Sequence, residues 1–184
     1  MLEFIRKRRE KVCELKIVEL YKDYLVAPDG KELVYDFIRH KHGGGAGILM
    51  VDENEEVFLV RQYRNSIDAL SVEIPAGGYS RIGESGEECA RREAEEETGF
   101  FPQRIYHVAN VVSSIGTFDE KTDIFIGTGL VQGVKKPDPD EYIEIIKVHV
   151  DKALDMIASG EIIDSKTLTA LYAYKHMKAE GIIE

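Results

Sequence analysis

Three glutamates in the middle of the chain, Glu93, Glu96 and Glu97, have a spacing that could serve chemistry. At positions i, i+3 and i+4 of a helix, their carboxylates lie on one face. Like charges so close together repel one another and destabilise the helix unless a cation lies among them. Because hard oxygen ligands on a rigid face suit Mg²⁺ or Mn²⁺, the spacing predicts a divalent metal site, and such a site suits phosphate chemistry.

The same pattern also has an ordinary interpretation, a solvated surface helix in a chain rich in glutamate. Arg92 lies four residues before the second glutamate and could hold that carboxylate in place. Residues 83–85 offer a helix start, and Gly99 tolerates the left-handed conformation that often follows a helix end. The small residues Ala90 and Ala94 share one flank, so we expect this helix to lie close against a sheet.

The whole string from residue 78 to residue 100 favours the metal site. It reads GYSRIGESGEECARREAEEETGF and matches the Nudix box, Gly-x5-Glu-x7-Arg-Glu-apolar-x-Glu-Glu-x-Gly-apolar. The matching residues are Gly78, Glu84, Arg92, Glu93, Ala94, Glu96, Glu97, Gly99 and Phe100. The chain therefore resembles the Nudix hydrolases, which cleave nucleoside diphosphates linked to another group. This resemblance implies a pyrophosphohydrolase with Mg²⁺ or Mn²⁺ as cofactor.

Composition is that of a folded enzyme with one substantial core. The 184 residues are 43% hydrophobic and 32% charged, and 24 basic against 34 acidic side chains give a net charge of −10. This charge, without a basic stripe, argues against nucleic acid as a partner. Cys13 and Cys89 are isolated, which suggests free thiols in a reducing cytoplasm. The opening residues lack an apolar signal region and no run is long enough to span a membrane, so we expect a cytoplasmic protein.

The elements around the box helix are expected to form a mixed α/β fold. Strand-like runs cover residues 11–20, 31–39, 46–51, 57–63, 70–74, 105–113, 122–129 and 143–150, and helix-like runs cover 151–158 and 165–178. Ala27-Pro28-Asp29-Gly30 predicts a hairpin turn, and Leu168, Leu171 and Tyr172 are expected to share a packing face. The Nudix resemblance implies an α/β/α sandwich over residues 43–184, preceded by an N-terminal β-hairpin extension over residues 1–42.

Segments outside the box resemble one branch of the family, the ADP-ribose pyrophosphatases. FLVRQYRNSI, residues 58–67, is similar to the strand and loop that bring an arginine to the substrate phosphates. VEIPAGG, residues 72–78, is similar to the strand before their box, and residues 159–174 resemble their C-terminal helical segment. The resemblance covers residues 32–176 and implies a nucleotide-sugar substrate such as ADP-ribose, cleaved to AMP and a sugar phosphate.

This resemblance assigns the metal site. Glu93 and Glu97 are expected to hold the metal and to be catalytic, with Glu96 as a further ligand or bridge. The backbone carbonyl of Ala76 is expected to complete the coordination, although one extra residue before the box glutamate leaves Gly77 as the alternative. Three further box residues are expected to orient the site: Gly78, Glu84 and Arg92.

A general base is expected outside the helix, on the loop of residues 114–120. Glu120 matches the base position of related enzymes, and Asp119 is the alternative; a solvated loop charge is the plain interpretation of Glu120. Related ADP-ribose pyrophosphatases usually have Ser-Pro-Gly in this loop, where this chain has Ile115 in place of the proline. The loop loses the fixed φ of proline, so other nucleotide sugars and dinucleotides stay open as substrates.

Arginines are the expected phosphate contacts, because a guanidinium gives paired donors to phosphate oxygens. Arg64 is the first candidate, with a surface salt bridge as its alternative, and Arg61 and Arg39 are weaker candidates. Tyr63, Tyr79 and Phe118 could stack on a base or ribose, but ordinary packing is the simpler interpretation. For His40 and His42, a solvated strand end is favoured over metal ligation, because the zinc spacing is missing.

Other functions fit the sequence less well. A non-catalytic, ligand-sensing Nudix domain does not need all three box glutamates, and a hydrolase of nucleic acid does not fit the acidic charge. In the related pyrophosphatases the N-terminal segment exchanges between two subunits. Apolar positions such as Val18, Leu20, Val34 and Phe37 in this segment therefore lead us to expect a homodimer.

Overall fold

The computed structural model describes residues 3–136 and 141–183, which form two compact units. The first unit comprises the chain up to Gly44 together with Val112–Lys121. The second comprises Gly45–Val111 and the chain from Thr122 onward. The box helix and the sheet that supports it therefore belong to one unit, and the loop with the candidate base belongs to the other.

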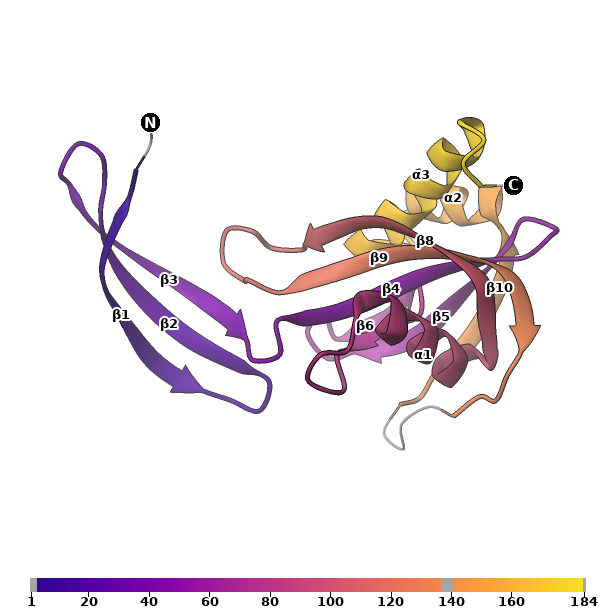
Figure 1. The fold of residues 1–184 in the computed structure, drawn as a ribbon, viewed down its shortest axis with the longest axis horizontal. Helices are drawn as coiled ribbons and strands as arrows, with labels where there is room; N and C mark the ends of the chain where they lie inside the picture. Colours follow the sequence, from indigo (N-terminus) through magenta and orange to yellow (C-terminus); the bar gives the residue numbers. More distant parts are fainter. Residues whose placement is uncertain (1–2, 137–140, 184) are drawn as a thin grey trace. The chain divides into compact units, whose positions relative to one another are not determined.

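The first unit is built on a three-stranded antiparallel sheet of β1 (Ile5–Glu14), β2 (Val18–Val26) and β3 (Glu32–His40), in that order (Figure 1). The expected turn after β2 is present, with the Gly30 amide donating to the Ala27 carbonyl at 2.9 Å. Gly30 has φ of 85°, a conformation that glycine adopts without strain.

The strand expected over residues 11–20 is wrong, because these residues turn between β1 and β2. The Leu15 amide donates to the Val18 carbonyl at 2.8 Å, which closes that turn. The extension is therefore three strands and not a single hairpin. Alternating apolar residues indicated strand correctly, but a tight turn without glycine or proline left no signal in the pattern.

The loop of the first unit is bound to the free edge of β3. The Ile38 amide donates to the Thr117 carbonyl at 2.7 Å, and the Asp119 amide donates to the Ile38 carbonyl at 3.1 Å. Ile38 and Phe118 thereby form a parallel bridge. Since both polar groups of Ile38 face the loop, the edge of β3 holds the segment that ends at Glu120.

Within the described residues, the second unit contains a seven-stranded sheet and three helices (Figure 1). The sheet order is β10-β5-β4-β9-β8, with β6 paired to β5 and β7 paired to β4. The strands are β4 (Gly44–Val51), β5 (Glu56–Arg64), β6 (Ala69–Glu73), β7 (Ala76–Gly78), β8 (Phe100–Val112), β9 (Lys121–Gln132) and β10 (Glu144–His149). The helices are α1 (Gly86–Thr98), α2 (Val150–Ala158) and α3 (Ser165–Ala179).

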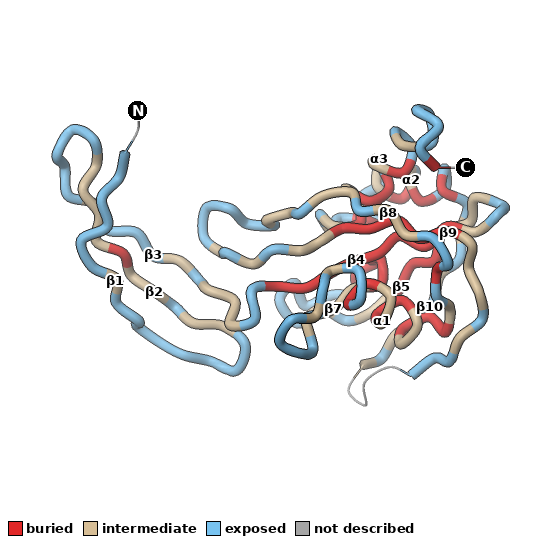
Figure 2. Tube along the Cα trace, in the orientation of Figure 1, coloured by how far each residue is buried: buried red, intermediate tan, exposed pale blue. Residues whose placement is uncertain are grey.

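Strand β4 is buried on both faces and separates two hydrophobic clusters (Figure 2). Ile48 and Met50 pack in one cluster with α1, while Leu49 and Val51 pack in the other with α2 and α3. Successive side chains of a strand point to opposite faces, so one strand serves both layers. The helices therefore cover the two faces of the sheet, and the expected α/β/α sandwich is confirmed.

The packing face of α3 was predicted correctly at Leu168 and Leu171 but not at Tyr172. Leu171 is buried, but Tyr172 is exposed, and Tyr174 takes the core position instead. Thr167, Ala170, Leu171 and Tyr174 form the i, i+3, i+4, i+7 stripe of a helix packed on one side. None of the helices in the described part of the chain is long and apolar enough to cross a membrane.

Candidate active site

Helix α1 carries the box glutamates and is fixed at both ends. Ser85 caps its start, since the Glu88 amide donates to the Ser85 hydroxyl at 3.2 Å and the Ser85 amide donates to the Glu88 carboxylate at 2.9 Å. Gly99 ends it with φ of 80°, and the Gly99 amide donates to the Glu95 carbonyl. These caps confirm the helix start and stop expected from the sequence.

The flank of α1 that faces the sheet is formed by small residues. Ala90 and Ala94 are fully buried against the cluster that includes Ile48. On the neighbouring strand β7, a Cβ at Gly77 would lie 2.2 Å from Glu93 Oε1. Only glycine lets the backbone of β7 approach this carboxylate so closely. The helix and the strand therefore bring the glutamates against the backbone of residues 76–78.

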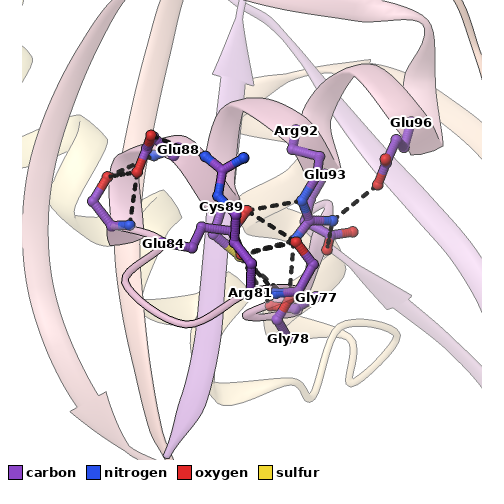
Figure 3. A network of polar contacts seen from close by, with 11 residues as sticks. Gly77, Gly78, Arg81, Glu84, Glu88, Cys89, Arg92, Glu93 and Glu96 are labelled. Carbon is purple, nitrogen blue, oxygen red and sulfur yellow. Dashed lines mark hydrogen bonds and ion pairs between the residues drawn. The ribbon is translucent and has the colours of Figure 1, made fainter. Parts of the chain in front are cut away.

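Arg92 lies at the centre of the polar network that holds these glutamates (Figure 3). Its Nη1 donates to Glu93 Oε1 at 2.6 Å and to Glu96 Oε2 at 2.9 Å. Its Nε donates to Glu84 Oε1 at 3.0 Å, and its Nη2 donates to the Gly78 carbonyl at 2.9 Å. The expected orienting residues thus share one guanidinium, which partly offsets the repulsion among the carboxylates.

Glu93 and Glu97 are buried, unlike the residues of a solvated acidic helix. Their exposed fractions are 7% and 1%, and the Ala76 amide donates to Glu97 Oε2 at 3.1 Å. Burial and, to a smaller extent, the negative charge of the neighbouring Glu93 raise the pKa of Glu97 to about 8. Burial likewise raises the pKa of Glu93 to about 7, against the opposing effect of Arg92. The fold therefore buries two neighbouring carboxylates in a setting where their ionisation costs free energy.

These carboxylates fit a divalent cation in chemistry and in setting. Both are hard oxygen donors, and a cation beside them would offset the burial of their negative charge. Among residues 3–136 and 141–183, no group of three or more His, Cys, Asp or Glu is gathered as a ligand cluster. On α1, Arg92 lies between Glu93 and Glu96. The half-exposed Glu96 would have to turn away from Arg92 to become a third ligand.

The backbone geometry favours Ala76 over Gly77 as the carbonyl ligand. The Ile48 amide donates to the Pro75 carbonyl at 2.9 Å, so the Pro75 carbonyl faces β4. In an extended strand the amide and carbonyl of one residue point to the same side, and neighbours alternate. Because the Ala76 amide faces Glu97, the Ala76 carbonyl also faces α1.

Arg64 lies at the end of β5 and is engaged in a bidentate ion pair. Its Nε and Nη2 donate to the two carboxylate oxygens of Glu73 at 2.7 and 2.6 Å. The negative charges of Glu73 and Glu97 both raise the pKa of Arg64. Arg61 instead pairs with surface carboxylates, Glu144 at 3.2 Å and Glu161 at 3.7 Å. Arg64 is therefore the better candidate for a phosphate contact, because its guanidinium is held in one orientation and feels the charge of Glu97.

The remaining candidates, Arg39, Asp119 and Glu120, lie in the first unit. Asp119 Oδ1 accepts a hydrogen bond from the His40 amide at 2.8 Å, and its Oδ2 lies 3.7 Å from Arg39 Nε. Glu120 Oε1 lies 3.9 Å from His40 Nε2. Asp119 is thus occupied as a loop anchor, which leaves Glu120 as the better candidate for a base.

Several side chains differ from their expected settings. His40 is only 11% exposed and packs beside the Phe118 ring, so the expected solvated strand end is wrong for this residue. Tyr79 packs against the cluster that includes Ile48, as expected, and its hydroxyl donates to Asp123 Oδ2 at 2.8 Å. Tyr63 instead is exposed, and its hydroxyl donates to Asp68. Sequence reasoning passed over Glu73, although a charge inside the apolar run LSVEIPAG was the available signal.

Known proteins share both the sequence pattern and the fold. The family model of the NUDIX domain matches residues 41–171. An ADP-ribose pyrophosphatase of Bacillus subtilis (strain 168) is 31% identical over 165 residues, which cover 89% of this chain and 88% of that protein. A GDP-mannose pyrophosphatase of Salmonella paratyphi B is 32% identical over 155 residues, 74% of this chain and 78% of that protein.

A solved structure described as an ADP compounds hydrolase matches 98% of this chain and 97% of its own length, with a TM-score of 0.85. At 18% identity this likeness concerns the fold. The family match, together with the intact box on α1, assigns the family as well as the fold. The chain belongs to the NUDIX family and is a pyrophosphohydrolase.

Proposed function

We propose that this enzyme hydrolyses the pyrophosphate bond of ADP-ribose or a related nucleotide sugar, releasing AMP, or another nucleoside monophosphate, and a sugar phosphate. The observation that carries the proposal is the buried pair Glu93 and Glu97, in which Glu93 accepts from Arg92 and Glu97 accepts from the Ala76 amide. Such a site binds hard cations and acts on polyanions. We place Mg²⁺ or Mn²⁺ at Glu93 and Glu97, with Glu96 and the Ala76 carbonyl as further ligands.

A bound divalent ion supplies neutralisation of the phosphate charge and lowers the pKa of bound water. Arg92 keeps Glu93 oriented, and Glu96 would turn away from Arg92 when it serves as a ligand. Arg64 donates to phosphate oxygens, and its contact with the substrate strengthens as negative charge develops. Glu120 accepts the proton of the attacking water as general base. Arg61 and Arg39 are assigned to outer contacts with the substrate.

The relatives support the nucleotide-sugar class. ADP-ribose and GDP-mannose are both nucleoside diphosphates attached to a sugar, and this chain is similar to pyrophosphatases of each. Ile115, in the loop before Glu120, lacks the fixed φ of a proline, and because it is 89% exposed, side-chain packing does not replace that constraint. This favours a substrate range that includes more than one nucleotide sugar.

The oligomeric state and the cellular compartment are inferred from the exposed apolar residues and from the two cysteines. The N-terminal sheet exposes apolar residues of the described chain, including Leu20 and Val34, which fits a homodimer. Cys13 and Cys89 are both free thiols, which fits the reducing cytoplasm of a cell.

A substrate panel tests the proposal. The purified protein is incubated with Mg²⁺ or with EDTA and with ADP-ribose, GDP-mannose, other nucleotide sugars and a dinucleoside polyphosphate. The proposal predicts metal-dependent release of a nucleoside monophosphate and a sugar phosphate from at least one nucleotide sugar. Hydrolysis of only the dinucleoside polyphosphate would show that dinucleotides, and not nucleotide sugars, are the substrate class. Binding without turnover of any compound would indicate a sensing domain.

A further inference from the structure

Glu73 lies at the end of β6 and is a buried carboxylate with two cationic partners. It is 2% exposed, and both of its oxygens accept from Arg64. The Lys166 ammonium of α3 donates to the same Oε2 at 2.5 Å. A buried charge needs partners, and these two cationic side chains provide them.

The first turn of α3 holds this cluster in place. Asp164 caps the helix through the Thr167 amide at 3.0 Å and also pairs with Lys166 at 2.9 Å. Thr167 Oγ1 accepts a hydrogen bond from the Ile74 amide at 2.8 Å. The turn therefore binds two consecutive residues of the chain, Glu73 and Ile74, immediately before the segment that meets Glu97.

A carboxylate is an unexpected neighbour for an arginine that binds phosphate. By charge alone, Glu73 weakens the attraction between Arg64 and an anionic substrate. Its geometry offers a compensating benefit, because the bidentate pair fixes the plane of the guanidinium. The pair uses Nε and Nη2 of Arg64, so Nη1 takes no part in it, and the side chain stays partly exposed.

We propose that Glu73 is a positioning residue: clamped by Lys166 of α3, it holds the Arg64 guanidinium in the orientation that contacts the substrate phosphates. This inference rests on the proposed function and adds to it a part for the first turn of α3. It also gives a reason for the string Asp164-Ser165-Lys166-Thr167, which ties the C-terminal helix to the phosphate contact.

Glu73→Gln distinguishes a positioning role from a purely electrostatic effect, because the two explanations predict changes in kcat/KM of opposite sign. Removal of a negative charge beside a phosphate site should raise kcat/KM if only charge matters. Loss of the bidentate pair should lower kcat/KM by about tenfold or more if Glu73 positions Arg64. Glu56→Gln is the matched control: Glu56 accepts an ion pair from Lys147 at 2.7 Å on β5, and its loss should leave kcat/KM within about twofold.

A double-mutant cycle shows whether Glu73 acts through Arg64. In an Arg64→Ala background, Glu73→Gln should cause little further loss of kcat/KM, since the group it positions is gone. Lys166→Met should lower kcat/KM in the same non-additive way, and Lys166→Arg should restore most of it. Lys175→Met removes a lysine of the same helix that pairs with Asp151, and it should have no effect. Circular dichroism and Tm of each variant confirm a folded protein at the assay temperature.

The outcomes are distinguishable from those of the substrate panel. An active wild-type protein whose Glu73→Gln variant keeps or raises kcat/KM would overturn the positioning role and leave the proposed function intact. Additive losses in the Arg64→Ala background would also overturn it. If Glu73→Gln does not fold, Lys166→Met in the wild-type and Arg64→Ala backgrounds carries the test, because a loss of kcat/KM through charge alone would persist when Arg64 is absent. A wild-type protein that hydrolyses nothing in the panel would remove the proposed function and this inference together.

Discussion

Glu93 and Glu97 are the side chains for which burial and charge are most opposed. A carboxylate in an apolar setting keeps its proton to higher pH, and the second carboxylate beside it strengthens this effect. The ion pair with Arg92 offsets part of the conflict, since it reaches Glu93 directly. The part of this cost that Arg92 does not offset favours the binding of a cation beside the two carboxylates. The spacing of the box glutamates therefore indicates a metal site.

The free energy of unfolding should therefore depend on pH in a characteristic direction. The pKa of Glu97 is about 8 in the folded protein and about 4.3 in an unfolded chain, so the folded state binds more protons between these values. The contribution of Glu97 to stability is full below about pH 4.3 and is lost as pH rises towards 8. Without metal, Tm should fall between pH 5.5 and pH 8, and Mg²⁺ should raise Tm more at pH 8, where it displaces fewer protons.

Differential scanning fluorimetry with EDTA or Mg²⁺ measures both effects. A Glu93→Gln/Glu97→Gln variant is the control, because it should lose the Mg²⁺ effect and much of the pH dependence. An equal Mg²⁺ shift in the control and in the wild-type protein would mean that the ion binds elsewhere.

Glu120 is tested by a change that keeps its shape. Glu120→Gln should lower kcat by about a hundredfold or more with little change in KM, because a general base acts mainly in the transition state. Asp119→Asn serves as the comparison, since Asp119 anchors the loop through the His40 amide and should affect KM as well as kcat. Steady-state kinetics on the best substrate of the panel would assign the base to another residue if Glu120→Gln kept its kcat.

Residues at fixed sequence spacing could be predicted, whereas partners brought together by folding could not. The contact of Arg92 with Glu96, four residues later on α1, follows from helix geometry, and the box spacing marked Glu84 and Glu93 as further residues of the site. The joining of Arg64 to Glu73 and Lys166 requires β5, β6 and α3 to meet, which one sequence does not specify. For the same reason, the burial of His40 against the loop was missed.

At the scale of elements, periodicity gave the right type for most segments and failed at one turn. Ala90 and Ala94 predicted close packing of α1, and both are buried. The strand expected over residues 11–20 crosses the boundary between β1 and β2, because apolar alternation continues through the turn. The docking of residues 117–119 on the edge of β3 had no local signal, since backbone hydrogen bonds do not depend on side-chain type.

The loop before Glu120 provides a prediction about specificity. Because Ile115 is exposed and leaves the loop less constrained than a proline would, ADP-ribose should be preferred over at least one other nucleotide sugar by less than about a hundredfold. Ile115→Pro should narrow this range if the backbone at this position already has φ near −65°, and lower activity otherwise. Ratios of kcat/KM across the panel measure it, and a thousandfold selectivity of the unmodified protein for ADP-ribose would contradict it.

At the scale of the whole molecule, the first unit exposes apolar side chains that a small sheet rarely leaves to water. Val12, Ile17, Leu20, Val34 and Tyr35 are all exposed in the single chain. Three strands without a covering layer bury little apolar area, so such a sheet is marginal by itself. A second copy of the chain is the partner that the family resemblance suggests.

The protein should therefore be a homodimer in solution. Light scattering at micromolar concentration should give about twice the chain mass of 20.8 kDa. Leu20→Glu/Val34→Glu places charge on the exposed apolar strands and should shift the mass towards the monomer. A wild-type mass near 20.8 kDa would contradict the dimer.

Glu97 is the proposed ligand of the catalytic cation, and Glu97→Gln removes its negative charge while nearly keeping its shape. At saturating Mg²⁺, kcat of Glu97→Gln on the best nucleotide sugar should fall by about a thousandfold or more, because a neutral amide cannot replace the carboxylate. Tm of the metal-free variant should stay the same or rise, since one of two repelling buried carboxylates is removed. Near-normal kcat in a folded Glu97→Gln protein would show that Glu97 does not hold a catalytic cation.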